Sequence, residues 1–271
     1  MNPARPVLWG VLNVTPDSFS DGGEFFSHDR AISQATLLVE HGAGVIDVGG
    51  ESTRPGAQRV AVEVEQERVI PVIAALTKRG YVTSIDTMNA STARAAIEAG
   101  ATVVNDVSGG LADPDMFSVV AESGVDYVIM HWRGHSDVME GLASYDNVAR
   151  DVRNELQERV ALAVGAGISA DRIILDPGVG FAKTPAHNWA LLSGIDDVTS
   201  LGHRVLVGAS RKRFLGELLP EGHEIAQRDE PSAVLGVLLA QRGVWGLRVH
   251  NPLIHTQALD VWQALAEGGT Q

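Results

Sequence analysis

The apolar run Val7-Leu8-Trp9-Gly10-Val11-Leu12 leads directly into the polar segment Asn13-Val14-Thr15-Pro16-Asp17-Ser18-Phe19-Ser20-Asp21-Gly22-Gly23. The run has the composition of a short buried strand, whereas Pro16 and the two closing glycines favour a loop. Between them lie four side chains that accept hydrogen bonds and one aromatic side chain, Phe19. We interpret this segment either as a long turn or as a lid over a site at the end of the strand.

Seven further apolar runs repeat this pattern, each ending in polar residues and followed by a segment with helical periodicity. The runs are nearly continuous in Val, Ile and Leu, as expected for strands covered on both faces. The predicted strands are residues 7–12, 45–49, 82–85, 102–104, 127–130, 172–175, 205–208 and 245–249. The predicted helices are residues 29–41 (with Asp29 as its cap), 63–78, 90–98, 115–122, 144–166, 187–193 or 187–201, 231–242 and 252–266.

Eight strands alternating with helices and no long linker predict an α/β protein with one parallel sheet. Eight such units favour closure into a single (β/α)8 TIM barrel over residues 1–271, with the active site at the C-terminal strand ends. An open doubly wound sheet is the alternative. It lacks support because no G-x-G-x-x-G motif follows the first strand.

The bulk composition narrows the class of partner. The 271 residues carry a net charge of -13, which argues against a nucleic-acid partner because phosphate backbones require a basic surface. There is no apolar run of about 18 residues or more for a membrane span, and the N-terminus lacks a signal-peptide pattern. The absence of cysteine excludes disulfides and thiolate metal sites. We expect a cytoplasmic enzyme that acts on small molecules.

Polar side chains follow every predicted strand, and the carboxyl ends of barrel strands meet on one face. Taken singly, Asp86 and Asn105 could equally cap the helices that follow them, and we interpret His131 as a hydrogen-bonded structural residue. The candidate set at this face is Asn13, Thr53, Arg54, Asp86, Asn105, His131, Asp176, Ser210, Lys212, Arg248 and His250.

The residue types at these ends indicate the chemistry of the ligand. Buried carboxylates such as Asp86 and Asp176 require N–H donors or a cation, and a flat heterocycle with an amino group and a ring N–H supplies such donors. Lys212, Arg248 and His250 gather cationic groups at the last two strands, where phosphates often bind in this fold. Asn13 could offer a neutral oxygen to Mg²⁺. The residues predict a heterocyclic substrate carrying phosphate and a second, acidic partner.

Several motifs, in this order, resemble the dihydropteroate synthase family, and the resemblance spans the chain from Val7 to the last helix. The first two motifs are long and specific, whereas the short ones alone would mean little. The motifs are residues 12–23 (LNVTPDSFSDGG), 49–56 (GGESTRPG), 85–87 (IDT), 105–109 (NDVSG), 130–131 (MH), 176–181 (DPGVGF), 210–212 (SRK) and 248–250 (RVH).

This resemblance implies a (β/α)8 homodimer that uses Mg²⁺ to condense 6-hydroxymethyl-7,8-dihydropterin diphosphate with p-aminobenzoate, giving 7,8-dihydropteroate and pyrophosphate in folate synthesis. It implies catalytic roles for Asp86, Asp21, Lys212 and Asn13, the last beside the metal. The implied pterin contacts are Asp86, Asn105, Asp176 and Lys212, with Met130 and Phe181 as apolar neighbours. Arg248 and His250 would bind the diphosphate, Thr53 a substrate, and Arg54, Pro55, Ser210 and Phe19 the p-aminobenzoate.

The implied mechanism breaks the C–O bond early, and Asp86 stabilises the resulting pterin cation before the amine attacks. Met130 and Phe181 have an alternative interpretation as ordinary core residues. Two alternatives to the synthase function stay open. One is a methyltetrahydrofolate-dependent methyltransferase, against which Arg248, His250 and the first loop argue. The other is a catalytically silent pterin-binding paralogue.

Overall fold

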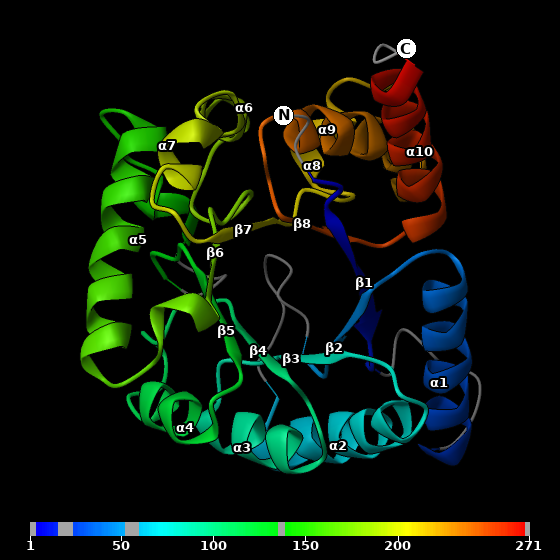
Figure 1. Ribbon diagram of the computed structural model, residues 1–271, viewed down its shortest axis with the longest axis vertical. Coiled ribbons are helices and arrows are strands. Elements are labelled where there is room, and N and C mark those ends of the chain that lie inside the picture. Colours follow the sequence, from blue (N-terminus) through cyan, green and yellow to red (C-terminus); the bar gives the residue numbers. More distant parts are fainter. Residues whose placement is uncertain (1–3, 16–23, 52–59, 135–138, 269–271) are drawn as a thin grey trace.

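The computed structural model describes residues 4–15, 24–51, 60–134 and 139–268, which form a closed barrel of eight parallel strands in sequential order (Figure 1). The predicted barrel is therefore confirmed, and the open sheet is excluded. The strands are β1 (Val7–Asn13), β2 (Val45–Gly49), β3 (Thr83–Asp86), β4 (Val103–Asp106), β5 (Asp126–Met130), β6 (Ile173–Asp176), β7 (Arg204–Val207) and β8 (Gly246–Val249).

Helices surround the barrel as an outer ring (Figure 1). Among the described residues, no helix is long and apolar enough to cross a bilayer. The α-helices are α1 (Glu24–Glu40), α2 (Val62–Lys78), α3 (Ala90–Glu98), α4 (Met116–Ser123), α5 (Val148–Gly165), α6 (Pro185–Ser193), α7 (Ile195–Thr199), α8 (Arg213–Gly216), α9 (Asp229–Gln241) and α10 (Pro252–Gly268). Short 3-10 turns are η2 (Met139–Leu142), η3 (Ala170–Arg172) and η4 (Ile225–Arg228).

The structure corrects several predicted helix starts. Because α1 begins at Glu24, Asp29 lies within the helix and does not cap it. The start of α5 is Val148, because the Asn147 side chain accepts a hydrogen bond from the Arg150 N–H at 3.1 Å and so caps the helix. The alternative cap roles of Asp86 and Asn105 are wrong, since α3 and α4 begin several residues later. The short helix α8 was not predicted.

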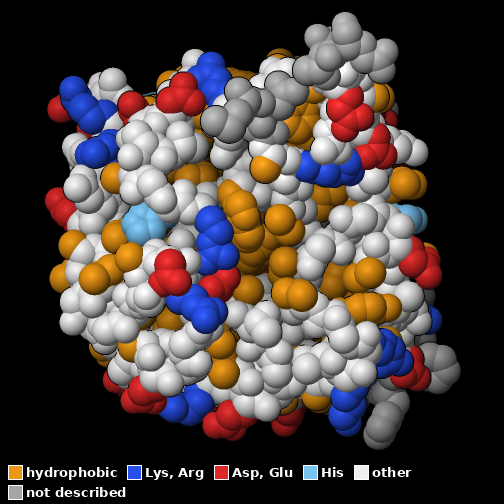
Figure 2. All heavy atoms as spheres, in the orientation of Figure 1, with side chains coloured by type: hydrophobic (Ala, Val, Ile, Leu, Met, Phe, Trp, Pro, Cys, Tyr) orange, Lys and Arg blue, Asp and Glu red, His pale blue; other side chains and the backbone are white. Residues whose placement is uncertain are grey.

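The inner face of the barrel is apolar toward the amino ends of the strands. Trp9, Val45, Val103, Val128, Ile174 and Leu206 form a buried cluster there. Trp9 also contacts Trp245 edge to face, with ring centroids 6.1 Å apart. Figure 2 shows hydrophobic side chains gathered at the middle of one barrel face, with basic and acidic side chains beside them. The larger core lies between the outer faces of the strands and the helices.

Candidate active site

Strand geometry places the predicted site residues above the apolar inner cluster. Successive strand residues point to opposite faces, so a residue two positions after an inward-facing one also faces inward. Advancing two residues from the inner cluster reaches Asp47 on β2, Asn105 on β4, Met130 on β5 and Asp176 on β6. The C-terminal half of the barrel interior is therefore polar, as the strand-end pattern predicted.

The centre of this polar layer is Arg248 on β8, which lies between two carboxylates from other strands. Its Nε donates to Asp47 Oδ2 at 2.6 Å, and its Nη2 donates to Asp86 Oδ2 at 2.7 Å. Asn105 Nδ2 also donates to Asp47 Oδ2, at 3.0 Å. Two carboxylates face one guanidinium, so this group of residues carries excess negative charge when both acids are ionised.

Two polar atoms of this layer are buried without a partner among the described residues: Asp47 Oδ1 and Ser84 Oγ. Burial raises the pKa of Asp86 to about 7, although Arg248 acts in the opposite direction. Burial acts to lower the pKa of Arg248, but Asp47 and Asp86 raise it well above its usual value. Unpartnered acceptors and excess negative charge together suit a ligand that offers N–H donors.

A third carboxylate, Asp176, lies at the end of β6. Asp176 Oδ1 accepts a hydrogen bond from the Gly178 N–H at 2.7 Å, and burial raises the pKa of Asp176. Lys212 Nζ donates to the Val179 carbonyl and lies 4.7 Å from the centroid of the partly exposed Phe181 ring. Burial lowers the pKa of Lys212 to about 8. Met130 is 4% exposed and faces the same interior.

Ser210 and His250 lie together at the ends of β7 and β8. The Ser210 Oγ is 3.2 Å from the His250 backbone N–H and 3.1 Å from its Nδ1. Arg211, which lies between Ser210 and Lys212 in the sequence, has a φ of 60° and forms two hydrogen bonds of 2.8 Å with the buried Asp229 carboxylate. That ion pair fixes a strained turn, and the turn presents Ser210 and Lys212 from one short segment.

Asn13 ends β1 next to the carboxylate cluster. A side-chain carbon placed on Gly49 would lie 3.6 Å from Asp86 Oδ2 and 3.8 Å from Asn13 Oδ1, so both oxygens face the same space. Mg²⁺ takes few protein ligands when phosphates and waters supply the others, and a neutral amide oxygen beside a carboxylate fits that requirement. The described residues contain no group of three or more His, Cys, Asp or Glu suited to hold a metal by themselves.

The structure brings together, at one end of the barrel, the described members of the predicted set. Arg248 lies among the carboxylates, and its contact with diphosphate stays a prediction. The expected structural role of His131 agrees with its hydrogen bonds to Glu155 and Lys183. The predicted residues Phe19, Asp21, Thr53, Arg54 and Pro55 lie outside the described residues.

Sequence reasoning missed Asp47 and Lys183. Asp47 is fully buried in the middle of β2. A carboxylate within the apolar run Val-Ile-Asp-Val was a signal available in the sequence, because a buried strand tolerates a charge only where it is paired. Lys183 follows β6 by several residues, and no periodicity in the sequence predicts that its side chain contacts His131.

Comparisons with known proteins agree with this geometry. A family model described as "Pterin binding enzyme" matches residues 9–250. The dihydropteroate synthase of Mycobacterium leprae is 47% identical over 100% of this chain and 97% of its own length. The Bacillus subtilis dihydropteroate synthase is 44% identical over 91% of this chain and 84% of its own.

Solved structures give the same result. The Xanthomonas albilineans dihydropteroate synthase with 4-aminobenzoic acid superposes with a TM-score of 0.90 at 43% identity, covering 97% of this chain and 93% of that one. A structure from the same organism in complex with 7,8-dihydropteroate has a TM-score of 0.87 at 40% identity, covering 97% and 94%.

The closed barrel, its polar inner layer and the family model define the class of this protein as a pterin-binding enzyme. Within that class, the relatives that match this chain over nearly its full length are dihydropteroate synthases. The chain belongs to the dihydropteroate synthase family, whose members are transferases.

Proposed function

We propose that this chain condenses 6-hydroxymethyl-7,8-dihydropterin diphosphate with p-aminobenzoate. In that reaction the C–O bond to the diphosphate breaks, a C–N bond to the aromatic amine forms, and the amine loses a proton. The products are 7,8-dihydropteroate and pyrophosphate. The observation that carries the proposal is the inner layer of Asp47, Asp86, Asn105 and Asp176 around Arg248 and Lys212, in a chain similar over its full length to these synthases.

The carboxylates support the pterin end of the proposal. Asp176 and Asn105 offer acceptors and donors matched to the amino group and ring N–H of a pterin, and Lys212 offers a cation above the Phe181 ring. Asp86 supplies a fixed negative charge in a site shielded from water, where it stabilises a ring cation more strongly than in bulk solvent.

The diphosphate group of the substrate would lie against Arg248, His250 and Asn13. His250 and Arg248 would stabilise charge that develops on the departing diphosphate. Asn13 would hold Mg²⁺ together with diphosphate oxygens, and the metal when bound would neutralise the leaving group. Loops that carry Phe19, Asp21, Thr53, Arg54 and Pro55 would exclude water from the cation and, with Ser210, form the p-aminobenzoate pocket.

The full chain incubated with both substrates and Mg²⁺ tests this proposal. We expect release of pyrophosphate that requires p-aminobenzoate, with an equal amount of dihydropteroate. Pterin binding without any pyrophosphate release would instead support a silent paralogue. Methyl transfer from methyltetrahydrofolate would support the methyltransferase alternative and overturn the synthase proposal.

Removal of Mg²⁺ is expected to abolish turnover, because the diphosphate leaving group then keeps its full charge. Turnover should return when Mg²⁺ is added back after chelation. Asn13→Ala should raise the Mg²⁺ concentration for half-maximal rate by about tenfold or more. An unchanged Mg²⁺ dependence in this variant would contradict the metal role of Asn13.

Phe19→Ala is expected to raise the KM for p-aminobenzoate by about tenfold, the equivalent of about 1.5 kcal/mol of lost apolar contact. The dissociation constant for the pterin diphosphate alone should stay nearly unchanged. Steady-state kinetics and calorimetric titration measure the two quantities separately. Equal losses of both affinities would argue against a place for Phe19 in the p-aminobenzoate pocket.

We also propose that the chain forms a homodimer. The neighbouring helices α9 and α10 expose large apolar side chains, with Val234 61%, Leu238 54%, Val261 71% and Leu265 77% accessible. Such a concentration of exposed apolar surface is typical of a protein interface. Sedimentation equilibrium should give twice the chain mass of 28.8 kDa, and a monomer at micromolar concentration would contradict the proposal.

A further inference from the structure

The side-chain nitrogen of Lys183 makes three polar contacts, all of them with other atoms of the protein. Its Nζ donates to the Gly178 carbonyl at 2.9 Å and to the Phe181 carbonyl at 3.0 Å, and it lies 3.0 Å from His131 Nδ1. An ammonium group has three N–H donors and no acceptor. The three contacts therefore account for all its donors and join β5 to the segment after β6.

His131 is 3% exposed and links Lys183 to helix α5. Its Nε2 lies 2.9 Å from Glu155 Oε2. Burial acts to raise the pKa of Glu155, but hydrogen bonds from His131 and Arg133 outweigh it and lower that pKa to about 2, so this carboxylate can only accept. Nε2 therefore carries the proton and donates to Glu155, and Nδ1 of the neutral ring accepts from Lys183, whose own pKa burial lowers to about 7. Burial, aided by the nearby Lys183 charge, lowers the pKa of His131 to about 4. The imidazole is therefore neutral and held as one tautomer at neutral pH.

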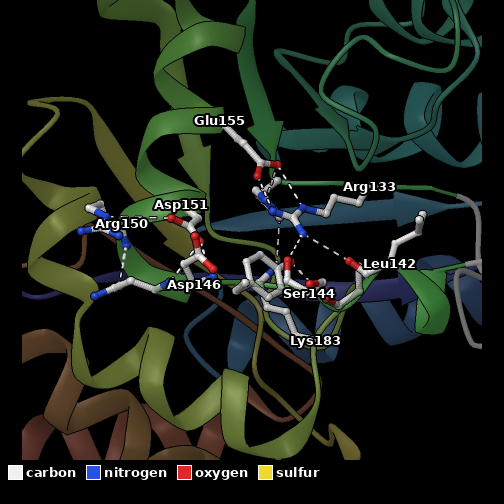
Figure 3. A network of polar contacts seen from close by, with 12 residues as sticks. Arg133, Leu142, Ser144, Asp146, Arg150, Asp151, Glu155 and Lys183 are labelled. Atoms are coloured by element: carbon white, nitrogen blue, oxygen red, sulfur yellow. Dashed lines mark hydrogen bonds and ion pairs between the residues drawn. The ribbon is translucent and has the colours of Figure 1, made fainter.

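Glu155 is itself fixed by Arg133, which follows β5. Arg133 Nε donates to Glu155 Oε2 at 3.2 Å, and its Nη1 donates to the backbone carbonyls of Leu142 at 3.2 Å and Ser144 at 2.6 Å. Figure 3 shows Arg133 between the Glu155 carboxylate and these carbonyls, with Lys183 nearby. The guanidinium also lies 3.9 Å from the centroid of the Tyr145 ring.

The segment that Lys183 holds is also the segment that presents the pterin-side groups. The Gly178 N–H donates to Asp176, the Val179 carbonyl accepts from Lys212, and the Phe181 ring lies beside the Lys212 ammonium. Gly178 has a φ of 66°, and a side-chain carbon there would lie 2.2 Å from the His131 carbonyl oxygen. The turn is therefore packed directly against the residue that orients Lys183.

We propose that Lys183 is a positioning residue that holds residues 178–181, and through them Asp176 and Lys212, in the geometry that binds the pterin ring. His131 and Glu155 orient Lys183 from β5 and α5. This inference rests on the proposed function for the identity of the ligand, but the contacts that define it lie within the protein. Removal of Lys183 should therefore affect the pterin side and spare the p-aminobenzoate side.

Lys183→Met removes the donors and keeps most of the side-chain volume. We expect the dissociation constant for the pterin diphosphate to rise about tenfold or more, which is the scale of one charged hydrogen bond. The KM for p-aminobenzoate at saturating pterin should change by less than about threefold. Lys78→Met, on the exposed end of α2, is the matched control and should leave both unchanged. Equal losses on both sides, or wild-type pterin affinity in Lys183→Met, would overturn the proposal.

Two further readouts separate positioning from general loss of structure. Glu155→Gln should weaken pterin binding in the wild-type background and have little further effect in the Lys183→Met background, since both act through one chain of contacts. Nitrogen-15 spectra should show neutral His131 with its proton on Nε2, and Lys183→Met should change the Nδ1 resonance. Additive effects, or a doubly protonated His131 at neutral pH, would contradict the proposal.

If the wild type bound no pterin diphosphate, the proposed function would fail and not this inference. The nitrogen-15 spectrum of His131 would still test the contacts of Lys183 in the absence of ligand.

Discussion

Asp86→Asn is expected to lower single-turnover rates about 10²–10³-fold, the usual effect of removing one preorganised electrostatic contact to a charged transition state. The substitution keeps an oxygen that can accept from Arg248 Nη2, now 2.7 Å from Asp86 Oδ2, so the cluster should stay assembled. The pterin diphosphate should still bind with an affinity close to that of the wild type. Equal losses of binding and rate would contradict the proposed stabilisation of a cation.

The same variant gives a pH test. Because the pKa of Asp86 is raised to about 7 by burial, its carboxylate loses its charge as the pH falls through that value in the free enzyme. The wild-type kcat/KM for the pterin diphosphate should therefore fall below about pH 7, and Asp86→Asn should lack this acid limb. Glu122→Gln, at an exposed acid paired with Arg94, removes the same charge outside the site and should keep the limb.

Arg248→Met is expected to destabilise the fold by about 3 kcal/mol, because it leaves Asp47 and Asp86 buried without their cation. The Arg248 side chain is 21% exposed, so we take the lower end of the usual range for a broken buried pair. Denaturant unfolding measures this loss. Arg242→Met, in an exposed pair with Asp196, should cost no more than about 1 kcal/mol.

The loss in Arg248→Met should depend on pH in a defined direction. Buried carboxylates without a cation have raised pKa values in the folded state, so the folded protein binds more protons than the unfolded chain. Its free energy of unfolding should then decrease as the pH rises from 5 to 8, relative to the wild type. A pH-independent difference would mean that lost packing, and not uncompensated charge, causes the destabilisation.

The barrel could be predicted from the sequence because eight apolar runs alternate with helical segments, and eight such units favour closure of one parallel sheet into a barrel. The strand ends also identified Asp86, Asn105, Asp176 and Lys212 as neighbours. Periodicity could not show which side chains at the strand ends face the barrel interior, or which hydrogen bonds they form there. Arg248 was predicted at the diphosphate from its place at the last strand and from the resemblance, and that role stays a prediction. The sequence did not show that its guanidinium also contacts Asp47 and Asp86. Such pairing depends on cross-barrel distances that no local pattern encodes.

Residues outside strand ends were harder to predict. Lys183 lies on a connecting segment and contacts backbone carbonyls and the neutral His131. Glu155 lies on helix α5 and contacts His131 and Arg133. The sequence predicted a hydrogen-bonded structural role for His131, but it did not identify Glu155 and Lys183 as the hydrogen-bond partners of the two ring nitrogens. The start of α1 was missed because its first turn directly follows the polar loop, so Asp29 looked like a cap.

We propose that the C–O bond of the pterin diphosphate breaks before the aromatic amine attacks, so that a pterin cation forms first. The most direct test is a single-turnover comparison of substrate with hydrogen or deuterium on the methylene carbon that bears the diphosphate. Bond breaking to a cation predicts a clear normal secondary isotope effect that does not depend on the p-aminobenzoate concentration. Turnover with a rate ratio of one would contradict the proposed cation and the role of Asp86 in stabilising it.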